Sequence, residues 1–294
     1  MEQSKTNKMR IAILGGTGQI GAVITAEVIS SFPNAEILNC SRSGKGPSGF
    51  EFNVFQDDWS SLGKLDVLIN SIGIIEENGE NTFDKIHIGV IKKLISVRHN
   101  LGNPKIIHVS VLGADKKSPS RYASTKGIAD EILMKEEDWN IIRPSFVATP
   151  GTAIVQKVVM LKNMSKWQFG FLPIPAHFLT AKFQPVMGKD IAEVIINMIN
   201  DNLSTKIVYA TGPEYYTLED WINIIGKGKI RIIRIPKKII DFPFRMIIKI
   251  FPQIMSTDQY LLLGNDNIHE HSLLEKILKR KPLSTKRFWE EELS

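Results

Sequence analysis

The chain has 294 residues, of which 43% are apolar and 23% charged, so it is long enough for a sizeable core and ordinary in composition for a globular protein. Its one cysteine, Cys40, excludes a disulfide framework and favours a reducing compartment, and its six scattered histidines lack the spacing of a metal site. The net charge of +6 is carried by the segment 229–255, which argues against a nucleic-acid binder because such proteins show a wider basic footprint.

Short apolar runs alternate with helical patterns through the first half of the chain. The N-terminal stretch MEQSKTNKMR lacks the apolar core of a signal peptide, and no run of about 18 apolar residues could span a bilayer, so we expect a cytoplasmic protein. Strands are predicted at 9–14, 35–40, 50–55, 65–70, 105–110 and 139–144, with helices between them at 18–30, 83–100 and 120–135. This alternation predicts an α/β fold with a doubly wound parallel sheet that is covered on both faces.

The pattern changes after residue 144, where proline and glycine become frequent. Thr217 is the expected N-cap of one later helix, with Asp220 three residues on. We expect a smaller lobe beside the carboxyl edge of the sheet, with some elements that return to the main domain. Its predicted elements are a loop at 169–178, helices at 189–200 and 216–226, and a strand at 206–212.

The stretch ILGGTGQIGAVI, residues 13–24, follows the first predicted strand and opens the first helix. Its glycines fit both G-x-x-G-x-x-G, which begins at Gly15, and G-x-G-x-x-G, which begins at Gly16. Glycine there permits a tight turn, a close approach to a pyrophosphate and close helix–strand packing, and the helix N-terminus favours phosphate. We therefore predict a Rossmann dinucleotide-binding domain over 1–150 and a mixed C-terminal lobe over 151–294. The residues expected to hold the cofactor here are Gly15, Thr17, Gly18, Gln19, Ile20 and Gly21. A glycine-rich turn with a purely structural role is the alternative.

The end of the second predicted strand distinguishes between the two dinucleotides. The stretch LNCSRSGKG, residues 38–46, lacks the acid that NAD sites use to bind the ribose 2′-hydroxyl. It offers Ser41, Arg42 and Lys45 instead, and a guanidinium suits a 2′-phosphate by its charge and its bidentate geometry. NADP (NADPH) is therefore favoured over NAD. The alternative is that Arg42 is an ordinary solvated loop arginine.

The stretch RYASTKG, residues 121–127, places Tyr122 and Lys126 four residues apart, on one face of a predicted helix. Ser118 is the expected N-cap of this helix, with Pro119 in its first turn. Ligands of open α/β sheets bind at the carboxyl edge, where this helix begins. A nearby ammonium lowers the pKa of a phenol, so Tyr122 could exchange a proton with a carbonyl or alcohol while hydride moves to or from a nicotinamide. The alternative is a chance pair on a helix surface.

Taken together, these stretches resemble the short-chain dehydrogenase/reductase superfamily in its extended and atypical branches. The matching motifs are the glycine turn, NSIG at 70–73, YASTK at 122–126 and IIRPSFV at 141–147. The resemblance implies that Ser71 lies beside the cofactor, that Lys126 bonds the nicotinamide ribose, that Pro144 to Val147 lie near the nicotinamide, and that Asp57 or Asp58 lies near the adenine.

Enzymes of that superfamily carry a serine or threonine after the fifth strand, which polarises the substrate oxygen. Ser110 is the candidate here, twelve residues before Tyr122. The stretch SVLG departs from the usual Ser-Ser or Ser-Thr pattern, so that Val111 or Leu112 could occupy the critical place instead. The resemblance therefore implies a catalytic set of Tyr122, Lys126 and Ser110 whose serine is in doubt.

A closer resemblance is to the NAD(P)H-binding accessory-subunit family of respiratory complex I and its bacterial relatives. It rests on VSVLGAD at 109–115, SPSRYASTKG at 118–127, IIRPSFV at 141–147 and MSTDQYLLLGNDN at 255–267. It implies tight NADPH binding that serves structure rather than turnover. The function favoured from the sequence is an NADP-dependent oxidoreductase or epimerase-like enzyme that uses Tyr122 and Lys126 on an unknown small substrate. The alternative is a non-catalytic NADPH-binding scaffold or redox-sensing subunit at a membrane complex.

The basic segment 229–255 mixes Lys and Arg with Ile, Phe and Met. Its stretch FRMIIKIF, residues 244–251, has an apolar stripe at helical spacing made of Phe244, Ile247, Ile248 and Phe251. Such a pattern can lie on an anionic membrane surface or against a partner protein, which would give peripheral membrane or complex association. The alternative, which is the commoner case, is a core-facing helix with a solvated basic face, and the prolines at 236, 243 and 252 limit any long helix.

Overall fold

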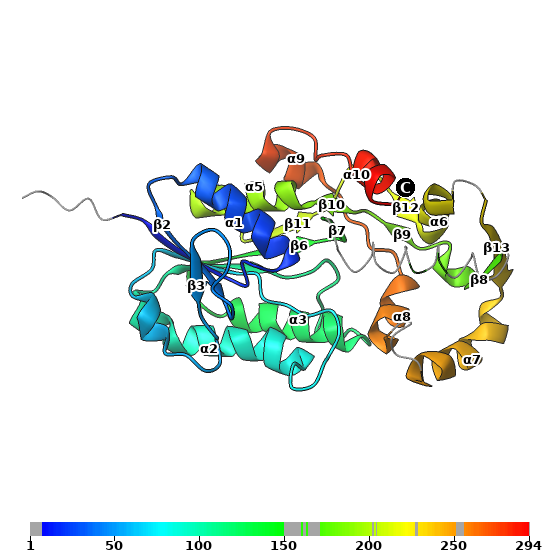
Figure 1. Cartoon of the computed structure of the whole chain (residues 1–294), viewed down its shortest axis with the longest axis horizontal. Helices are drawn as coiled ribbons and strands as arrows, with labels where there is room; N and C mark the ends of the chain where they lie inside the picture. The colour runs from blue at the N-terminus through cyan, green and yellow to red at the C-terminus, as the bar shows by residue number, and fades with distance from the viewer. Residues whose placement is uncertain are drawn as a thin grey trace, which may run out of the picture.

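Seven parallel strands form the central sheet in the order β11-β6-β5-β4-β1-β2-β3 (Figure 1). The computed structural model describes residues 8–149, 171–201, 205–226, 229–250 and 256–293, together with residues 160, 163 and 203. The strands are β1 Arg10–Leu14, β2 Glu36–Ser41, β3 Gly49–Glu51, β4 Val67–Asn70, β5 Lys105–Val109, β6 Trp139–Pro144 and β11 Ile207–Ala210. The strand order reverses between β1 and β4, which is where open α/β sheets bind ligands. The predicted doubly wound α/β fold is therefore confirmed.

Helices cover both faces of this sheet, as the alternating pattern predicted. One face carries α1 Gln19–Ser31, α5 Gly188–Ile199 and α9 Ser272–Leu278, and the other carries α2 Val90–Val97 and α3 Arg121–Leu133. The predicted helix over 83–100 is divided into a π-helix η2 at Asp84–Gly89, then α2, then a 3₁₀ turn η3 at Arg98–Leu101. A π-helical turn is rare and recurs at functional sites, so this division draws attention to η2.

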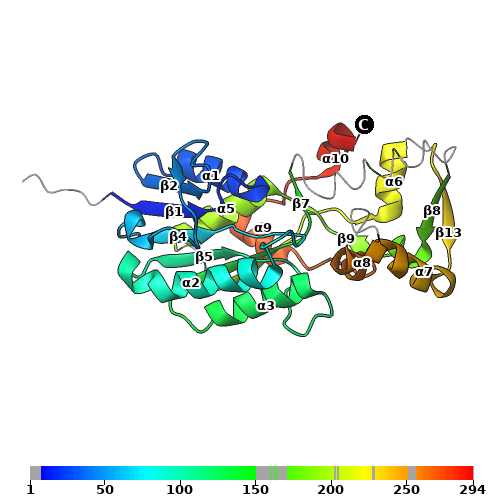
Figure 2. The same cartoon turned by 60° about the horizontal axis from the view of Figure 1, so that its bottom comes forward.

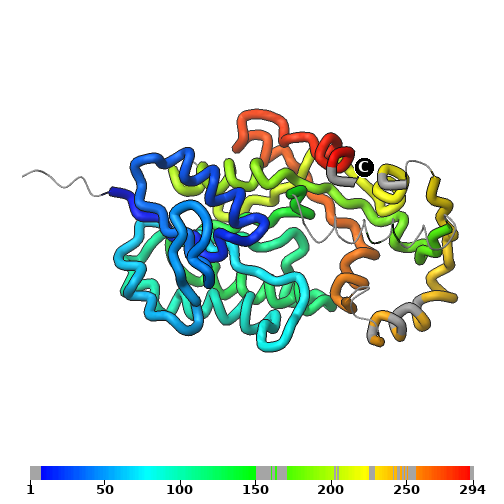
Figure 3. The backbone as a smooth tube through the Cα atoms, in the orientation of Figure 1, coloured from blue at the N-terminus to red at the C-terminus, as the bar shows by residue number. Residues whose placement is uncertain are grey.

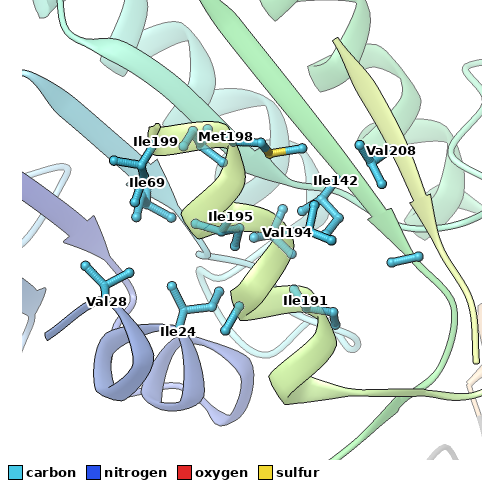
Figure 4. Close-up of a cluster of buried hydrophobic side chains, with 14 of the residues drawn as sticks. Ile24, Val28, Ile69, Ile142, Ile191, Val194, Ile195, Met198, Ile199 and Val208 are labelled. Carbon is cyan, nitrogen blue, oxygen red and sulfur yellow. The ribbon is translucent and has the colours of Figure 1, made fainter. Parts of the chain in front are cut away.

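The core on the α1 and α5 side is built from aliphatic side chains of helices and strands (Figure 4). Ile24 and Val28 of α1 belong to the same core as Ile195 and Met198 of α5, and all four are fully buried. Both helices present apolar residues at helical spacing, and that spacing lets each bury one stripe against a sheet that is apolar on both faces.

Part of the second half of the chain returns to the sheet. The strand β11 pairs with β6 and extends the sheet, while α5 packs beside α1 and α9 beside α5. Figure 3 shows the chain leaving the sheet after β6 and coming back through these elements. The first hydrophobic core consequently contains residues from both halves of the chain, among them Val208 and Leu274.

The C-terminal lobe lies at the far end of the molecule from β2 and β3 (Figure 2). Its helices are α6 Leu218–Gly226, α7 Lys237–Ile250, α8 Thr257–Leu263 and α10 Lys286–Leu293, and it contains the 3₁₀ turn η4 Ala176–Phe178. Another 3₁₀ turn, η1 Trp59–Leu62, belongs to the sheet domain. Its short strand pairs are β7 Val147–Ala148 with β10 Val186–Met187, β9 Lys182–Phe183 with β12 Tyr216–Thr217, and β8 Phe171–Pro175 with β13 Arg231–Ile235. Its own core contains Phe183 stacked on Trp221, with ring centroids 5.4 Å apart.

Two local predictions about this lobe have different outcomes. The N-cap is confirmed, because Thr217 Oγ1 accepts from the Asp220 backbone N–H at 3.2 Å and the Asp220 carboxylate accepts from the Thr217 N–H at 2.7 Å. The loop prediction for 169–178 is wrong for Phe171–Pro175, which is strand β8. Its partner β13 lies about sixty residues further along the chain, and this pairing outweighs the local proline signal.

Among the described residues, none of the helices combines the length and apolar character needed to cross a membrane. In the same parts of the chain, His, Cys, Asp and Glu side chains form no cluster of three or more that could hold a metal ion.

Candidate functional site

The glycine turn lies between β1 and α1, at the carboxyl edge of the sheet. Gly15 has a φ of 78° and donates its N–H to Cys40 O at 3.0 Å, and its carbonyl accepts from the Gly18 N–H at 2.9 Å. A Cβ added at Gly21 would lie 2.1 Å from Gly15 O, and one added at Gly16 would lie 2.1 Å from Asn39 Oδ1. The fold itself therefore requires glycine at these three positions, through a positive φ at Gly15 and close packing at Gly16 and Gly21.

Gly18 differs from the other three glycines because its environment is open. It is exposed, and a Cβ there would meet a single neighbour, Gly15 O, at 3.2 Å. It is also the N-cap of α1, so no side chain caps the helix, and the first turn of α1 contains no acid. The first N–H groups of a helix are unsatisfied within the helix and attract anions. Thr17, Gly18 and Gln19 thus form an exposed edge where a pyrophosphate fits.

The end of β2 supplies the groups predicted to select the dinucleotide. The Ser41 hydroxyl is buried and has no hydrogen-bond partner among the described residues, while Arg42 and Lys45 are exposed in the turn that follows. An orphaned buried hydroxyl costs free energy unless a ligand or water satisfies it. One acid was missed from the sequence: Glu51 on β3 pairs in register with Ser41, so its carboxyl group lies next to this end of β2.

The two acids proposed to lie near the adenine have local partners instead. Asp57 accepts from the Asn53 N–H at 2.7 Å, and Asp58 accepts from the Ser60 N–H at 2.9 Å as the N-cap of η1. The Asp57 turn also explains why β3 ends at Glu51, short of the predicted 50–55 strand. A cofactor contact by Asp57 stays a prediction.

The loop after β4 is attached to the glycine turn through Ser71. Its N–H and its hydroxyl both donate to Leu14 O, at 3.0 and 2.7 Å. A Cβ at Gly21 would lie 2.8 Å from this hydroxyl, which shows how close the loop comes to the turn. Asn70 supports the loop from within, since its Oδ1 accepts from the Ile72 N–H at 3.1 Å. The structure therefore brings Ser71 and the glycine turn together, and the contact of Ser71 with a cofactor stays a prediction.

The helix that carries Tyr122 begins at Arg121, and its N-cap is Ser120 rather than Ser118. The Ser120 hydroxyl accepts from the Ala123 N–H at 3.4 Å and donates to Asp258 Oδ1 at 2.7 Å. That carboxylate also accepts from the Tyr122 N–H at 3.0 Å. The prediction of Ser118 was wrong because an acid from α8, more than a hundred residues away in the chain, completes the cap at Ser120, two residues later.

Tyr122 is half-buried against two rings. Its ring meets those of Phe83 and His87 edge-on, with centroids 5.8 and 5.5 Å apart. Burial raises the pKa of Tyr122 to about 12. The expected lowering of this pKa by a lysine is therefore wrong for this structure, because the loss of solvent outweighs any attraction between the phenolate and an ammonium.

Lys126 is buried, and its Nζ donates to Val109 O at 3.1 Å. Burial lowers the pKa of Lys126 to about 8, with the Asp130 carboxylate acting in the opposite direction. A Cβ at Gly73 would lie 3.3 Å from this Nζ, so the ammonium lies between the end of β5 and the loop after β4. The contact of Lys126 with a nicotinamide ribose stays a prediction.

His87 is a member of this site that the sequence did not reveal. It lies in the π-helix η2, fully buried, with its Nδ1 2.9 Å from Thr125 Oγ1 and its Nε2 3.1 Å from Ile74 O. Burial, together with the Lys126 charge, lowers the pKa of His87 to about 3, so the ring is neutral at pH 7. A single histidine in a helical pattern gives no signal in the sequence, and neither does a π-helical turn.

Ser110 is part of a buried polar network under the sheet. Its hydroxyl donates to Asp130 Oδ2 at 2.9 Å, and Arg143 donates to the same oxygen through Nε at 2.9 Å and Nη2 at 2.8 Å. His108 Nε2 lies 3.7 Å from Asp130 Oδ1. Burial raises the pKa of Asp130, and the Arg143 charge opposes this rise. The structure thus joins Ser110 to Asp130, and the alternative residue Leu112 is a buried apolar side chain.

Pro144 and Val147 lie where the chain leaves the sheet for the lobe. Pro144 O accepts from the Leu112 N–H at 2.7 Å, and Val147 belongs to the first hydrophobic core. Between them, the Ser145 hydroxyl donates to Asn267 Oδ1 at 2.7 Å, which attaches the segment after α8 to this edge. Contacts of Pro144 and Val147 with a nicotinamide stay predictions.

No protein-family model matches the chain. Among curated proteins it is similar to NADH dehydrogenase (ubiquinone) 1 alpha subcomplex subunit 9, mitochondrial. The Arabidopsis thaliana protein is 28% identical over 234 residues, which are 73% of this chain and 56% of the plant protein. The Mus musculus protein is 25% identical over 189 residues, 63% of this chain and 48% of that protein. The chain spans about half the length of the curated relatives it matches, and it is their distant homologue.

Solved structures share the whole fold at low identity. A nucleoside-diphosphate-sugar epimerase from Staphylococcus aureus has a TM-score of 0.72 at 15% identity, over 96% of this chain and 100% of that chain. A UDP-glucuronic acid 4-epimerase from Bacillus cereus, in complex with UDP-glucuronic acid and NAD, has a TM-score of 0.66 at 15% identity, over 97% of this chain and 98% of its own. The chain therefore shares the fold of these epimerases, an α/β domain built on a parallel sheet with a smaller C-terminal lobe.

Proposed function

We propose that the chain binds NADP(H) at the glycine turn and holds it as a subunit of a protein assembly, without turning over a substrate. The observation that carries the cofactor assignment is the contrast among the glycines. The fold requires glycine at Gly15, Gly16 and Gly21, whereas Gly18 and the uncapped N-terminus of α1 are open at the carboxyl edge. A surface without side chains beside free N–H groups suits a pyrophosphate.

The described residues fit the rest of a phosphorylated dinucleotide. The orphaned Ser41 hydroxyl and the Arg42 guanidinium would hold the 2′-phosphate, and Ser71 would line the site beside the turn. Lys126 would bond the nicotinamide ribose from its place beside Gly73, with Pro144 and Val147 near the nicotinamide. NADPH, when bound, would supply a hydride at that end.

The polar groups at the nicotinamide end favour a holding role over a reaction. The Ser110 hydroxyl donates its hydrogen bond to the Asp130 carboxylate, and burial raises the pKa of Tyr122 to about 12. Both features disfavour the proton transfer that carbonyl reduction needs at neutral pH. The curated relatives are subunits of NADH dehydrogenase, which supports a place in an assembly for this chain.

An NADP-dependent oxidoreductase or epimerase-like enzyme is the second candidate. It is favoured by Tyr122 and Lys126, which lie at the carboxyl edge, with Lys126 at a pKa of about 8. A lysine close to its pKa at neutral pH can share protons with groups around it, as catalytic pairs do. The fold is shared with epimerases whose structures contain NAD, and this keeps the candidate open.

The cofactor assignment is tested by thermal unfolding with NADPH and with NADH. NADPH should stabilise the wild type more than NADH does, and Arg42→Ala should lose that difference while Lys92→Ala, an exposed cation on α2, keeps it. Stabilisation by NADH alone would contradict the 2′-phosphate site and would point to Glu51 as the group that binds the ribose.

The holding role is tested by NADPH oxidation against a panel of carbonyl compounds. We expect the wild type to show no rate above that of Tyr122→Phe, with NADPH bound equally by both. A wild-type rate that disappears in Tyr122→Phe while NADPH binding persists would establish the enzyme instead.

A further inference from the structure

Large apolar side chains are concentrated on the outer surface of the C-terminal lobe. Of the 13 large hydrophobic residues that are exposed in the described chain, nearly half lie on β8, β13 and α7: Phe171, Ile233, Ile239, Phe242, Met246 and Ile250. Phe242 is 75% exposed and Ile239 66%. Single exposed apolar residues are normal on a protein surface, but contiguous ones mark an interaction site.

Four of these residues form one stripe along α7. At about 100° per residue, positions 239, 242, 246 and 250 fall within an arc of about 80°. Ile248 falls on the opposite side of the helix, is 2% exposed and belongs to the core of the lobe. The helix therefore buries one apolar face and exposes a second. The stripe predicted from 244–251 is a different one: of its side chains the structure describes Ile248 alone, which points inward, and Phe251 lies outside the described residues.

Basic residues follow one side of the exposed stripe. Lys238 is exposed, and the helix positions of Arg245 and Lys249 fall in the same row as Lys238, about 40° from the nearest edge of the stripe. The first turn of α7 contains no acid, and the acid of the helix, Asp241, falls on the far side from the stripe. A cationic row beside an apolar stripe matches a surface that is apolar below a layer of negative charge.

The lobe presents this helix at an end of the molecule. Figures 1 and 2 both show α7 and the β8–β13 pair at the end opposite β2 and β3, with α8 between α7 and the sheet domain. Arg231 of β13 lies over the Phe171 ring at 5.7 Å, so the same combination of cation and apolar group continues from the helix onto the strands.

We propose that the exposed face of α7, formed by Ile239, Phe242, Met246 and Ile250, lies in the surface of a bilayer that contains anionic lipid. The apolar side chains would enter the boundary between headgroups and acyl chains, while Lys238 and its row would contact lipid phosphates. A protein partner is less well matched, because lysine is depleted at protein interfaces. This inference goes beyond cofactor binding and does not depend on it.

The test is cosedimentation of the full chain with vesicles. Vesicles of phosphatidylcholine with phosphatidylglycerol should bind the wild type, pure phosphatidylcholine should bind it far less, and added salt should release it. Lys238→Gln/Lys249→Gln, two positions of the cationic row, should weaken binding about 30-fold, since each basic residue near an anionic surface contributes about fivefold. Equal binding to both vesicle types, or to neither, would overturn the proposal.

The helix face is tested with a matched pair of variants. Ile239→Asp/Phe242→Asp should lose vesicle binding, whereas Leu273→Asp/Leu283→Asp, which changes two exposed residues outside the lobe surface, should keep it. Unfolding temperatures of both variants show whether they are folded. Vesicle binding that survives in Ile239→Asp/Phe242→Asp would refute the assignment. A wild-type dimer that forms without vesicles and is abolished in this variant would also refute it, because the face would then bind protein.

A labelled variant gives a readout that does not depend on losing a residue pair. Phe242→Cys can be labelled with an environment-sensitive dye, because the natural Cys40 is buried and burial raises its pKa to about 12. The fluorescence emission of the dye at position 242 should shift to shorter wavelength when anionic vesicles are added, and that of a dye on Leu283→Cys should not. A spectrum at 242 that is unchanged by anionic vesicles would overturn the proposal.

Discussion

Replacing Gly18 with alanine should weaken nucleotide binding and leave the fold intact. A Cβ at this position meets Gly15 O at 3.2 Å and nothing else within 4 Å, so a small adjustment of the turn accommodates it. The methyl group would, however, point into the exposed edge where we place the pyrophosphate. Gly18 is also the N-cap of α1, where alanine is less favourable than glycine, so we expect the free energy of unfolding without ligand to fall by no more than about 1 kcal/mol.

The expected loss of affinity follows from one charge-assisted contact. Losing a hydrogen bond to a charged group costs about 1.5–3 kcal/mol, which corresponds to about 10- to 150-fold in Kd. At an NADPH concentration of about 100 times the wild-type Kd, the ligand stabilises the wild type by about 2.7 kcal/mol. A 100-fold weaker variant would gain about 0.4 kcal/mol at the same concentration.

The assay is thermal unfolding with and without NADPH, and Gly21→Ala is the comparison. A Cβ at Gly21 lies 2.1 Å from Gly15 O, so this variant should lose stability even without ligand, by about 1–3 kcal/mol from overpacking. Only Gly18→Ala should lose most of the stabilisation by NADPH while it keeps most of the stability of the ligand-free chain. If Gly18→Ala keeps the full NADPH stabilisation, the pyrophosphate does not lie at this turn and our reasoning fails.

Other contacts make predictions of their own. Asp130→Ala would leave the half-buried Arg143 without its carboxylate, so urea denaturation should show a loss of about 3 kcal/mol, and a loss below about 1 kcal/mol would contradict the ion pair. Ser120→Ala should lower the free energy of unfolding by about 1–2 kcal/mol through the lost N-cap, and Ser118→Ala by clearly less; equal losses would restore Ser118 as the cap. Lys126 has a folded pKa of about 8 against an ordinary value of 10.5, so the unfolded chain binds more protons between these values and wild-type stability should rise with pH from about 8 to 10. In Lys126→Met that rise should shrink, and an unchanged pH profile would show that the lysine is not buried in solution.

The parts of the site that sequence alone predicted are those encoded by local rules. The glycine turn was predictable because Gly15 and Gly21 meet steric demands that lie within about ten residues of chain. Thr217 was predictable as a cap because its partner is three residues away. The alternation of strands and helices predicted the parallel sheet for the same reason, since each period is read within one element.

The parts that sequence could not predict depend on distant contacts. Ser120 caps its helix in concert with Asp258, and β8 is a strand because β13 pairs with it, although its own sequence contains proline. His87 joins Tyr122 through a π-helical turn that no periodicity reveals. Ser110 follows the fifth strand as a catalytic serine would, but its hydroxyl donates a hydrogen bond to the Asp130 carboxylate, twenty residues away in the chain.

Isothermal titration of the wild-type chain with NADPH tests the central claim most directly. We predict one binding site per chain, with NADPH tighter than NADH and with the NADPH preference lost in Arg42→Ala. Absence of any NADPH binding by the folded chain would contradict the account, because the glycine turn would then serve the fold alone.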